Sequence, residues 1–225
     1  MQPRSGLKNF MESDIYGLTA EEYSLGRSNI EVVNQMIAAG IKVIQYREKN
    51  KKAFYMYQEC LKIREQTRQA GVTFIVNDHI DLAIAVGADG VHIGQEDLPP
   101  KEVRRLVGNS MLIGLSTHLP VQAETAVRSG VVDYIGVGPI FATQTKKDVG
   151  QPVGWPYLEF VAKNINLPFV AIGGIKEHNV AEVCRHGARI CAIVTDIVGA
   201  ADIPAKVKAI RRAMAGKDEV GFSSI

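Results

Sequence analysis

One local pattern recurs along this chain: an amphipathic segment, a glycine, and then a short apolar run that ends in polar residues. The glycines that open these runs are Gly40, Gly71, Gly87, Gly108, Gly130 and Gly187. Just past a helix end, glycine adopts the left-handed conformation at little cost, so each glycine predicts a helix terminus followed by a strand. Two further apolar runs, at residues 15–19 and 168–174, bring the expected strands to eight.

Helices are expected between these strands, at residues 30–39, 52–70, 80–86, 101–107, 120–129, 155–163, 177–186 and 203–215. Continuous rather than alternating apolar strands indicate a parallel sheet that is covered on both faces. Eight strand–helix units in 225 residues predict an α/β fold, a single-domain (β/α)8 TIM barrel. A doubly wound open sheet is the alternative, but the first strand is not followed by the G-x-G-x-x-G turn typical of that fold.

The catalytic barrel domain is expected at residues 15–215, with an N-terminal extension at 1–14 and a flexible C-terminal tail at 216–225. A hydrophobic content of 46% is ample for one large core. The formal net charge of +2 is too small to indicate a nucleic-acid surface.

No apolar run reaches the length of roughly 18 residues that a membrane span needs, and residues 1–14 lack the apolar core of a signal peptide. We therefore expect a cytoplasmic protein with no membrane partner. The sequence is also compatible with a homo-oligomer. The three cysteines have no metal-type spacing, so they are interpreted as idle or buried thiols.

Active sites of such barrels lie at the carboxyl ends of the strands, so the polar residues there are candidates. Arg47 and Lys49 follow the second expected strand on alternate residues, hence on one side, where with Lys146 they could hold a diphosphate. Gln45 would hydrogen-bond a neutral group. The bland alternative is an exposed strand end, in which Glu48 pairs with one of its basic neighbours.

Asp78 and Asp97 follow neighbouring expected strands, so both carboxylates can face one point above the barrel. Magnesium favours one or two carboxylates together with waters and substrate phosphate oxygens, whereas zinc would require more His or Cys. The two aspartates therefore predict a Mg²⁺ site. The alternative is that each aspartate only caps the helix that follows it.

A second anion site is expected near the last two strands. The loop at residues 136–149 offers glycine backbone, the hydroxyls of Thr143 and Thr145, and the Lys146 ammonium, all suited to phosphoryl groups. Gly174 follows the seventh strand and Thr195 the eighth, the place where barrels frequently bind phosphate. A tight turn that simply needs glycine, or a solvated basic loop, would explain the same residues without a ligand.

The strand ends contain no convincing nucleophile. No cysteine lies there, Ser116 and His118 lack a third partner, and His118 is better interpreted as a hydrogen-bonding residue than as a general base. A site that supplies Mg²⁺, cations and N–H donors suits the departure of a diphosphate, with a second phosphate site for the acceptor.

Six ordered motifs now carry a resemblance: QYREK, FIVND, ADGVHIGQED, GLSTH, YIGVGPIFATQTKKD and AIGGI. In this order they resemble thiamine-phosphate synthases, also called thiamine-phosphate pyrophosphorylases, from about Tyr16 to Ala213. The resemblance implies a (β/α)8 barrel transferase of thiamine biosynthesis with Mg²⁺ as cofactor. Its implied substrates are 4-amino-2-methyl-5-(diphosphomethyl)pyrimidine and 4-methyl-5-(2-phosphoethyl)thiazole, and its products are thiamine monophosphate and diphosphate by a dissociative substitution.

The resemblance also assigns the site residues, and Asp78 and Asp97 would hold Mg²⁺. The pyrimidine diphosphate would bind to Gln45, Tyr46, Arg47, Glu48, Lys49, Asn77, Ser116 and Lys146. Of these, Arg47, Lys49 and Lys146 would be catalytic. The thiazole phosphate would bind to Thr143, Gln144, Thr145, Gly174, Val194 and Thr195.

The sequence departs from the family pattern after the eighth strand, where Thr195-Asp196 replaces the common Ser-Ala. An aspartate there would repel a phosphate unless its side chain points away. Two alternatives stay open: a thiazole tautomerase of the same superfamily, which uses a histidine near the position of His118, and a non-catalytic regulatory barrel that binds a phosphorylated ligand.

Overall fold

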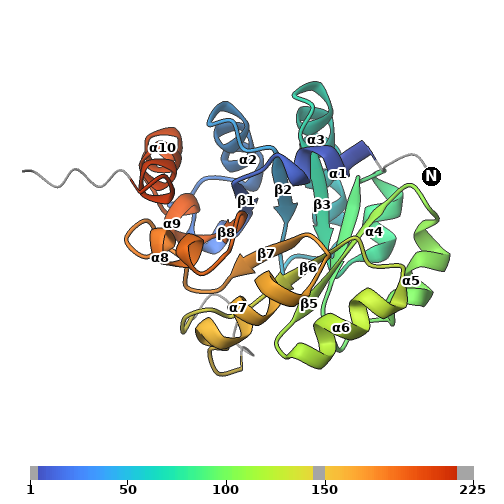
Figure 1. Cartoon of the computed structure of the whole chain (residues 1–225). Coiled ribbons are helices and arrows are strands. Elements are labelled where there is room, and N and C mark those ends of the chain that lie inside the picture. Colours follow the sequence, from blue (N-terminus) through green and yellow to red (C-terminus); the bar gives the residue numbers. More distant parts are fainter. Residues whose placement is uncertain (1–4, 144–149, 217–225) are drawn as a thin grey trace, which may run out of the picture.

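The computed structural model describes residues 5–143 and 150–216. In this part of the chain the strands close into one parallel barrel in sequence order, with β8 beside β1 (Figure 1). The strands are β1 (Ile15–Leu18), β2 (Val43–Tyr46), β3 (Thr73–Asn77), β4 (Gly90–Ile93), β5 (Leu112–Thr117), β6 (Tyr134–Val137), β7 (Phe169–Ile172) and β8 (Cys191–Ile193). The predicted (β/α)8 barrel is confirmed.

The helices between the strands surround the barrel. They are α2 (Asn29–Ala38), α3 (Ala53–Gln69), α4 (Ile80–Ala85), α5 (Pro100–Val107), α6 (Pro120–Ser129), α7 (Gly154–Asn164), α8 (Val180–Arg185) and α10 (Ile203–Met214). All six glycines that open the recurring pattern have a positive φ, between 62° and 101°, so the prediction of helix ends at these glycines is confirmed. The helix expected at residues 177–186 begins only at Val180, because the preceding residues form the loop that lines the site described below.

Three short elements were not expected from the sequence: α1 (Ser5–Met11), the 3-10 turn η1 (Glu21–Tyr23) and α9 (Thr195–Val198). Helix α1 covers the amino-terminal end of the barrel. Its Phe10 is fully buried with a ring centroid 4.4 Å from that of Tyr134, and Thr73, the first residue of β3, donates to Gly6 O at 3.2 Å. The barrel is therefore closed at the end opposite the site. The domain boundary at residue 15 stays a prediction.

The core has two layers. Side chains inside the barrel, among them Tyr16, Ile75, Leu112 and Tyr134, form one cluster, and the larger cluster fills the space between strands and helices. Burial of each large apolar side chain stabilises the fold by about 1.5–3 kcal/mol. Gly114 makes room inside the barrel, because a Cβ at this residue would lie 2.2 Å from a ring carbon of Tyr134.

None of the helices within the described ranges is long and apolar enough to cross a membrane. The three cysteines are free thiols, of which Cys60 and Cys191 are buried and Cys184 is partly exposed. The tail expected at residues 216–225 lies outside the described residues except for Gly216.

Candidate active site

Two neighbouring cavities open at the carboxyl ends of the strands, with volumes of about 450 and 780 Å³. They share part of their lining, including Arg47, Ser116 and His118. Two ligands could therefore bind side by side above the barrel.

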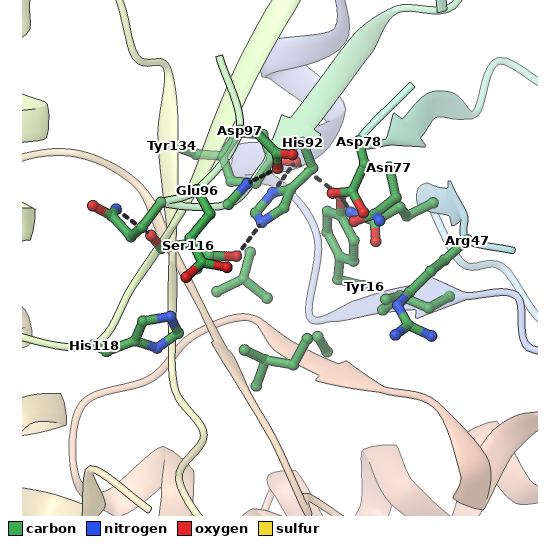
Figure 2. A pocket seen from close by; sticks show the side chains of 18 of the residues that line it. Tyr16, Arg47, Asn77, Asp78, His92, Glu96, Asp97, Ser116, His118 and Tyr134 are labelled. Atoms are coloured by element: carbon green, nitrogen blue, oxygen red, sulfur yellow. Dashed lines mark hydrogen bonds between the residues drawn. The ribbon is translucent and has the colours of Figure 1, made fainter. Parts of the chain in front are cut away.

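The first cavity is lined by cations from β2 and by polar residues from β3 and β4 (Figure 2). Arg47 and Lys49 both face it, together with Asn77. Within residues 5–143 and 150–216, neither cation forms an ion pair or a side-chain hydrogen bond, so the pairing of Glu48 with a basic neighbour is not observed. Two cations without a carboxylate partner in a cavity can bind an anion without first breaking an internal ion pair.

Asp78 and Asp97 line this cavity from the loops after β3 and β4. The capping alternative is wrong for both, because the N-cap of α4 is His79 and the N-cap of α5 is Pro99. Asp97 Oδ2 instead accepts from Gly94 N at 2.6 Å, and Asp78 has a φ of 60°, a left-handed conformation that is rare outside glycine. Its own N–H donates to His92 O at 2.8 Å, which holds the turn.

A chain of hydrogen bonds crosses the floor of the first cavity. The Gln45 amide donates to the Tyr16 hydroxyl at 2.9 Å, this hydroxyl lies 2.9 Å from that of Tyr134, and Tyr134 Oη lies 3.1 Å from His92 Nδ1. His92 Nε2 in turn lies 2.9 Å from Ser116 Oγ. Burial raises the pKa of both tyrosines, so their hydroxyls stay protonated and the chain links Gln45 to Ser116 through neutral groups.

Sequence reasoning assigned Gln45 and Ser116 but missed the tyrosines that connect them. The available signal was the period of two along a strand, which places Tyr16 on the barrel-interior side of β1 and Tyr134 on that of β6. Both tyrosines lie within expected apolar strands and were not among the polar candidates at the strand ends.

The second cavity lies above β6, β7 and β8. The sequence-predicted Thr143, Gly174, Val194 and Thr195 all line it, and the structure adds Lys176 and His178. Gly174 has a φ of 66°, and a Cβ there would lie 2.7 Å from Phe141 Cβ and 2.8 Å from Ala142 O. Only glycine fits this turn without strain, which leaves backbone exposed to the cavity.

Asp196, the departure from the family pattern, has a partner of its own. Its Oδ2 accepts from Glu177 N at 2.8 Å, and Glu177 is paired with Lys206 Nζ at 2.8 Å. The carboxylate is thus tied to the loop after β7 and is not among the groups that line the second cavity.

His118 lines both cavities. Its Nδ1 lies 2.5 Å from Gly138 O, and because a carbonyl only accepts, Nδ1 carries the proton. This contact agrees with the interpretation of His118 as a hydrogen-bonding residue.

Two residues expected near the pyrimidine diphosphate face elsewhere. Tyr46 is buried and its hydroxyl donates to Glu59 at 2.6 Å, while Glu48 accepts from Asn29 Nδ2 at 2.9 Å. Neither lines either cavity. Gln144, Thr145 and Lys146 lie outside the described residues.

The fold and these cavities define a class: (β/α)8-barrel enzymes that act on small phosphorylated molecules. The family model described as thiamine monophosphate synthase matches residues 15–197. A thiamine-phosphate synthase of Pelotomaculum thermopropionicum is 68% identical over 219 residues, which are 97% of this chain and 100% of that protein. A thiamine-phosphate synthase of Lawsonia intracellularis is 51% identical over 91% of this chain and 94% of that protein.

Among solved structures, the thiamine phosphate pyrophosphorylase of Pyrococcus furiosus superposes with a TM-score of 0.83. It is 30% identical in sequence, and the match covers 93% of this chain and 98% of that chain. The chain belongs to the thiamine monophosphate synthase family.

Proposed function

We propose that the chain is a transferase that joins 4-amino-2-methyl-5-(diphosphomethyl)pyrimidine to 4-methyl-5-(2-phosphoethyl)thiazole and releases thiamine monophosphate and diphosphate. The observation that carries the proposal is the pair of adjoining cavities. One is lined by carboxylates and by two cations that form no ion pair within the described residues, and the other by glycine backbone and a lysine. The names of the relatives agree with it.

The reaction is a dissociative substitution. The aminopyrimidine expels the diphosphate, which takes the electron pair of the breaking carbon–oxygen bond, and the lone pair of the thiazole nitrogen then forms the new bond to the methylene carbon. Arg47 and Lys49 stabilise the charge that grows on the departing diphosphate, and Lys146 is assigned to the same task. Walls around both cavities exclude water that would otherwise capture the methylene cation.

The donor set fits magnesium. Asp78 and Asp97 offer hard oxygen ligands, His92 is engaged with Tyr134 and Ser116, and the described residues gather no group of three or more His, Cys, Asp or Glu of the kind that zinc requires. The remaining ligands would be waters and diphosphate oxygens. When bound, Mg²⁺ neutralises charge on the leaving diphosphate.

Gln45 and Ser116 hold the pyrimidine ring, assisted by Asn77. The Gln45 N–H donates to the Tyr16 hydroxyl, so Tyr16 can donate to Tyr134, and Tyr134 can donate to His92 Nδ1. The His92 Nε2–H then donates to Ser116. The Ser116 hydroxyl proton is left for the ligand.

The thiazole phosphate binds in the second cavity at Gly174, Val194, Thr195 and Thr143, with Gln144 and Thr145 assigned to the same ligand. Lys176 and His178 add a cation and an imidazole to this cavity that the sequence did not predict. A cation facing a phosphate strengthens the interaction in a partly enclosed site.

The tautomerase alternative stays open because His118 lines both cavities. The unpaired Arg47 and Lys49 favour the synthase, because a tautomerase has no diphosphate to hold. Cytoplasmic location and homo-oligomerisation stay predictions.

The deciding experiment measures diphosphate release by the purified protein with both substrates, with and without Mg²⁺, and with each substrate omitted in turn. The proposal requires diphosphate and thiamine monophosphate only when both substrates and the metal are present. Rearrangement of the thiazole without diphosphate release would favour the tautomerase.

A further inference from the structure

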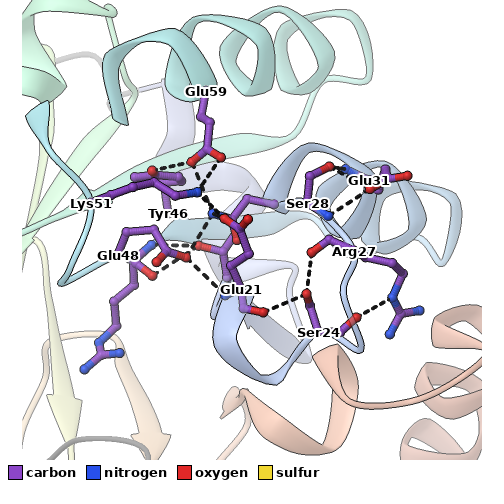
Figure 3. Close-up of polar contacts among 12 residues, drawn as sticks. Glu21, Ser24, Arg27, Ser28, Glu31, Tyr46, Glu48, Lys51 and Glu59 are labelled. Carbon is purple, nitrogen blue, oxygen red and sulfur yellow. Dashed lines mark hydrogen bonds and ion pairs between the residues drawn. The ribbon is translucent and has the colours of Figure 1, made fainter. Parts of the chain in front are cut away.

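Residues 46–51, at the end of β2 and just after it, make contacts on two sides of the strand, and Figure 3 shows Tyr46, Glu48 and Lys51 on one of them. Arg47 and Lys49 line the first cavity, whereas Tyr46, Glu48 and Lys51 make their contacts on the outer side of the barrel. The period of two along an extended chain accounts for Tyr46 and Glu48, which alternate with Arg47 and Lys49. Lys51 reaches Glu21 and Glu59 from the bend that follows.

We propose that Glu48 is a positioning residue and not a substrate ligand. In this inference, which rests on the proposed function, Glu48 belongs to a polar cluster with Glu21, Asn29, Lys51 and Glu59 that orients Arg47 and Lys49 toward the diphosphate. We call these five residues the β2 clamp.

The contacts of Glu48 are its first support. Glu48 Oε1 accepts from Asn29 Nδ2 at 2.9 Å and from the backbone N–H of Glu21 at 3.1 Å. Both partners belong to the segment between β1 and β2, so the Glu48 side chain ties the two loops together. Because these contacts fix the Glu48 side chain on the outer side of the barrel, the side chains of Arg47 and Lys49 point into the cavity.

Asn29 is the centre of the clamp. It is completely buried in the first turn of α2, and its Nδ2 also lies 3.2 Å from carboxylate oxygens of both Glu21 and Glu59. Three carboxylates therefore converge on one amide. Such a group is unfavourable without a nearby cation, because buried like charges repel each other.

Lys51 supplies that cation. Its Nζ contacts Glu21 and lies 2.5 Å from Glu59 Oε1. Burial alone would lower the pKa of the Lys51 ammonium, but the hydrogen bonds that it donates to Glu21 and Glu59 outweigh burial and raise it. Lys51 thus stays charged.

The charge balance has a consequence for the cavity. Asn29 and a backbone N–H hold Glu48 through Oε1, and within the described residues its carboxylate forms no ion pair with Arg47 or Lys49, the cations that adjoin it in sequence. The clamp therefore fixes the direction of the two cations and also keeps them available for an anion.

The backbone of this segment is held as well. Thr19 is fully buried, and its Oγ1 accepts from Arg47 N at 2.9 Å. On the other side, Tyr46 Oη donates to Glu59 Oε2 at 2.6 Å. Contacts on both sides of Arg47 restrict its backbone to one conformation.

The test compares Glu48→Ala, Glu48→Gln and Lys51→Met with the unchanged chain. Alanine removes the acceptor that holds the loop, so Glu48→Ala is expected to lower kcat/KM for the pyrimidine diphosphate by about 10- to 100-fold, the range that misplacement of a binding group produces. Glutamine keeps an oxygen for Asn29 and Glu21 N, so Glu48→Gln should lose much less. KM for the thiazole phosphate should stay unchanged in both variants.

Lys51→Met should act in the same direction as Glu48→Ala, although Lys51 lines neither cavity. Lys42→Met is the matched control, since Lys42 pairs with Glu12 on the exposed surface and the same charge is lost. Equal kinetics for Lys51→Met and Lys42→Met would overturn the proposal, as would an equal loss for Glu48→Gln and Glu48→Ala, which is the result expected of a direct ligand.

Binding of inorganic diphosphate with Mg²⁺, measured by calorimetry, tests the clamp without turnover. Each variant is first checked by thermal melting, and affinity is compared only among folded chains. The clamp predicts that Glu48→Ala weakens diphosphate binding and that the effect shrinks in an Arg47→Met background; full additivity would count against it. Failure of the proposed function would show instead as no thiamine monophosphate from the unchanged chain.

Discussion

Tyr134→Phe removes one oxygen from the middle of the hydrogen-bond chain below the first cavity. The hydroxyl lies 2.9 Å from Tyr16 Oη and 3.1 Å from His92 Nδ1, and Tyr134 is only 1% exposed. Tyr16 keeps its bond from Gln45, and His92 borders the cavity, where water can replace the lost partner. One buried hydrogen bond is then lost without replacement, which predicts a decrease of about 1–3 kcal/mol in the free energy of unfolding.

Tyr157→Phe is the matched control. Tyr157 is 5% exposed, and within the described residues its hydroxyl makes no hydrogen bond of normal geometry; the nearby Thr117 hydroxyl donates to Gly136 O instead. Loss of this oxygen should change stability by less than about 0.5 kcal/mol or increase it.

Guanidinium chloride unfolding of both variants and the unchanged chain measures the difference. Tyr134→Phe should also raise KM for the pyrimidine substrate, because the chain holds Gln45 and Ser116 in register. Equal unfolding free energies for Tyr134→Phe and Tyr157→Phe would refute the reasoning, because the hydrogen bonds of the Tyr134 hydroxyl would then contribute nothing to stability.

Three other changes test separate parts of the structure. Asp97→Asn should reduce turnover and shift its dependence to higher Mg²⁺ concentrations, and an unchanged rate at limiting Mg²⁺ would remove the metal assignment. Gly174→Val should block the thiazole phosphate, because its side chain would collide with Phe141 and the positive φ is strained for valine; normal thiazole KM would count against the second site. Burial raises the pKa of Asp14, but hydrogen bonds and charge from Arg211 outweigh it, so the folded pKa lies below the unfolded value. Asp14 then contributes stability above the unfolded pKa and loses it as pH falls through the folded pKa. In denaturation curves, Asp14→Asn should therefore destabilise the protein by about 0.5–1 kcal/mol at pH 7, and the difference should disappear as pH falls below the folded pKa.

The barrel was predictable because its signal is local and repeated. Each of the six glycines that open the recurring pattern marks a helix end, and each apolar run that follows becomes a buried parallel strand. Helix α1 was missed because seven residues with one fully buried side chain, Phe10, carry no periodic signal. Its position depends on the space at the barrel end, which only the closed sheet creates. Helix α9 has only four residues and is likewise too short to be predicted from a periodic pattern.

The sequence predicted which residues line the candidate site better than it predicted the directions of their side chains. Composition at the strand ends identified Arg47, Asp78 and Asp97, and the cavity includes all three. The side chain of Glu48 was assigned to the ligand because it stands in the same motif, although the period of two that places Arg47 and Lys49 on one side places Glu48 on the other. Its partner Asn29 lies 19 residues away and could not be identified without the fold.

Asp196 shows how a residue beside a phosphate site can be compatible with it. The sequence alone suggested repulsion, because a carboxylate follows the threonine that lines the second cavity. In the fold this carboxylate accepts the Glu177 N–H, and Lys206, whose pKa is raised by its hydrogen bond to Glu177 and further by the charge of Asp196, offsets part of the negative charge of the two carboxylates. The aspartate therefore fastens the loop after β7 to α9, and Lys206, which is not among the residues that line the second cavity, compensates part of its charge. A substitution that looks unfavourable for binding a phosphate is thus accommodated by a lysine on α10, a compensation that depends on contacts between residues distant in the sequence.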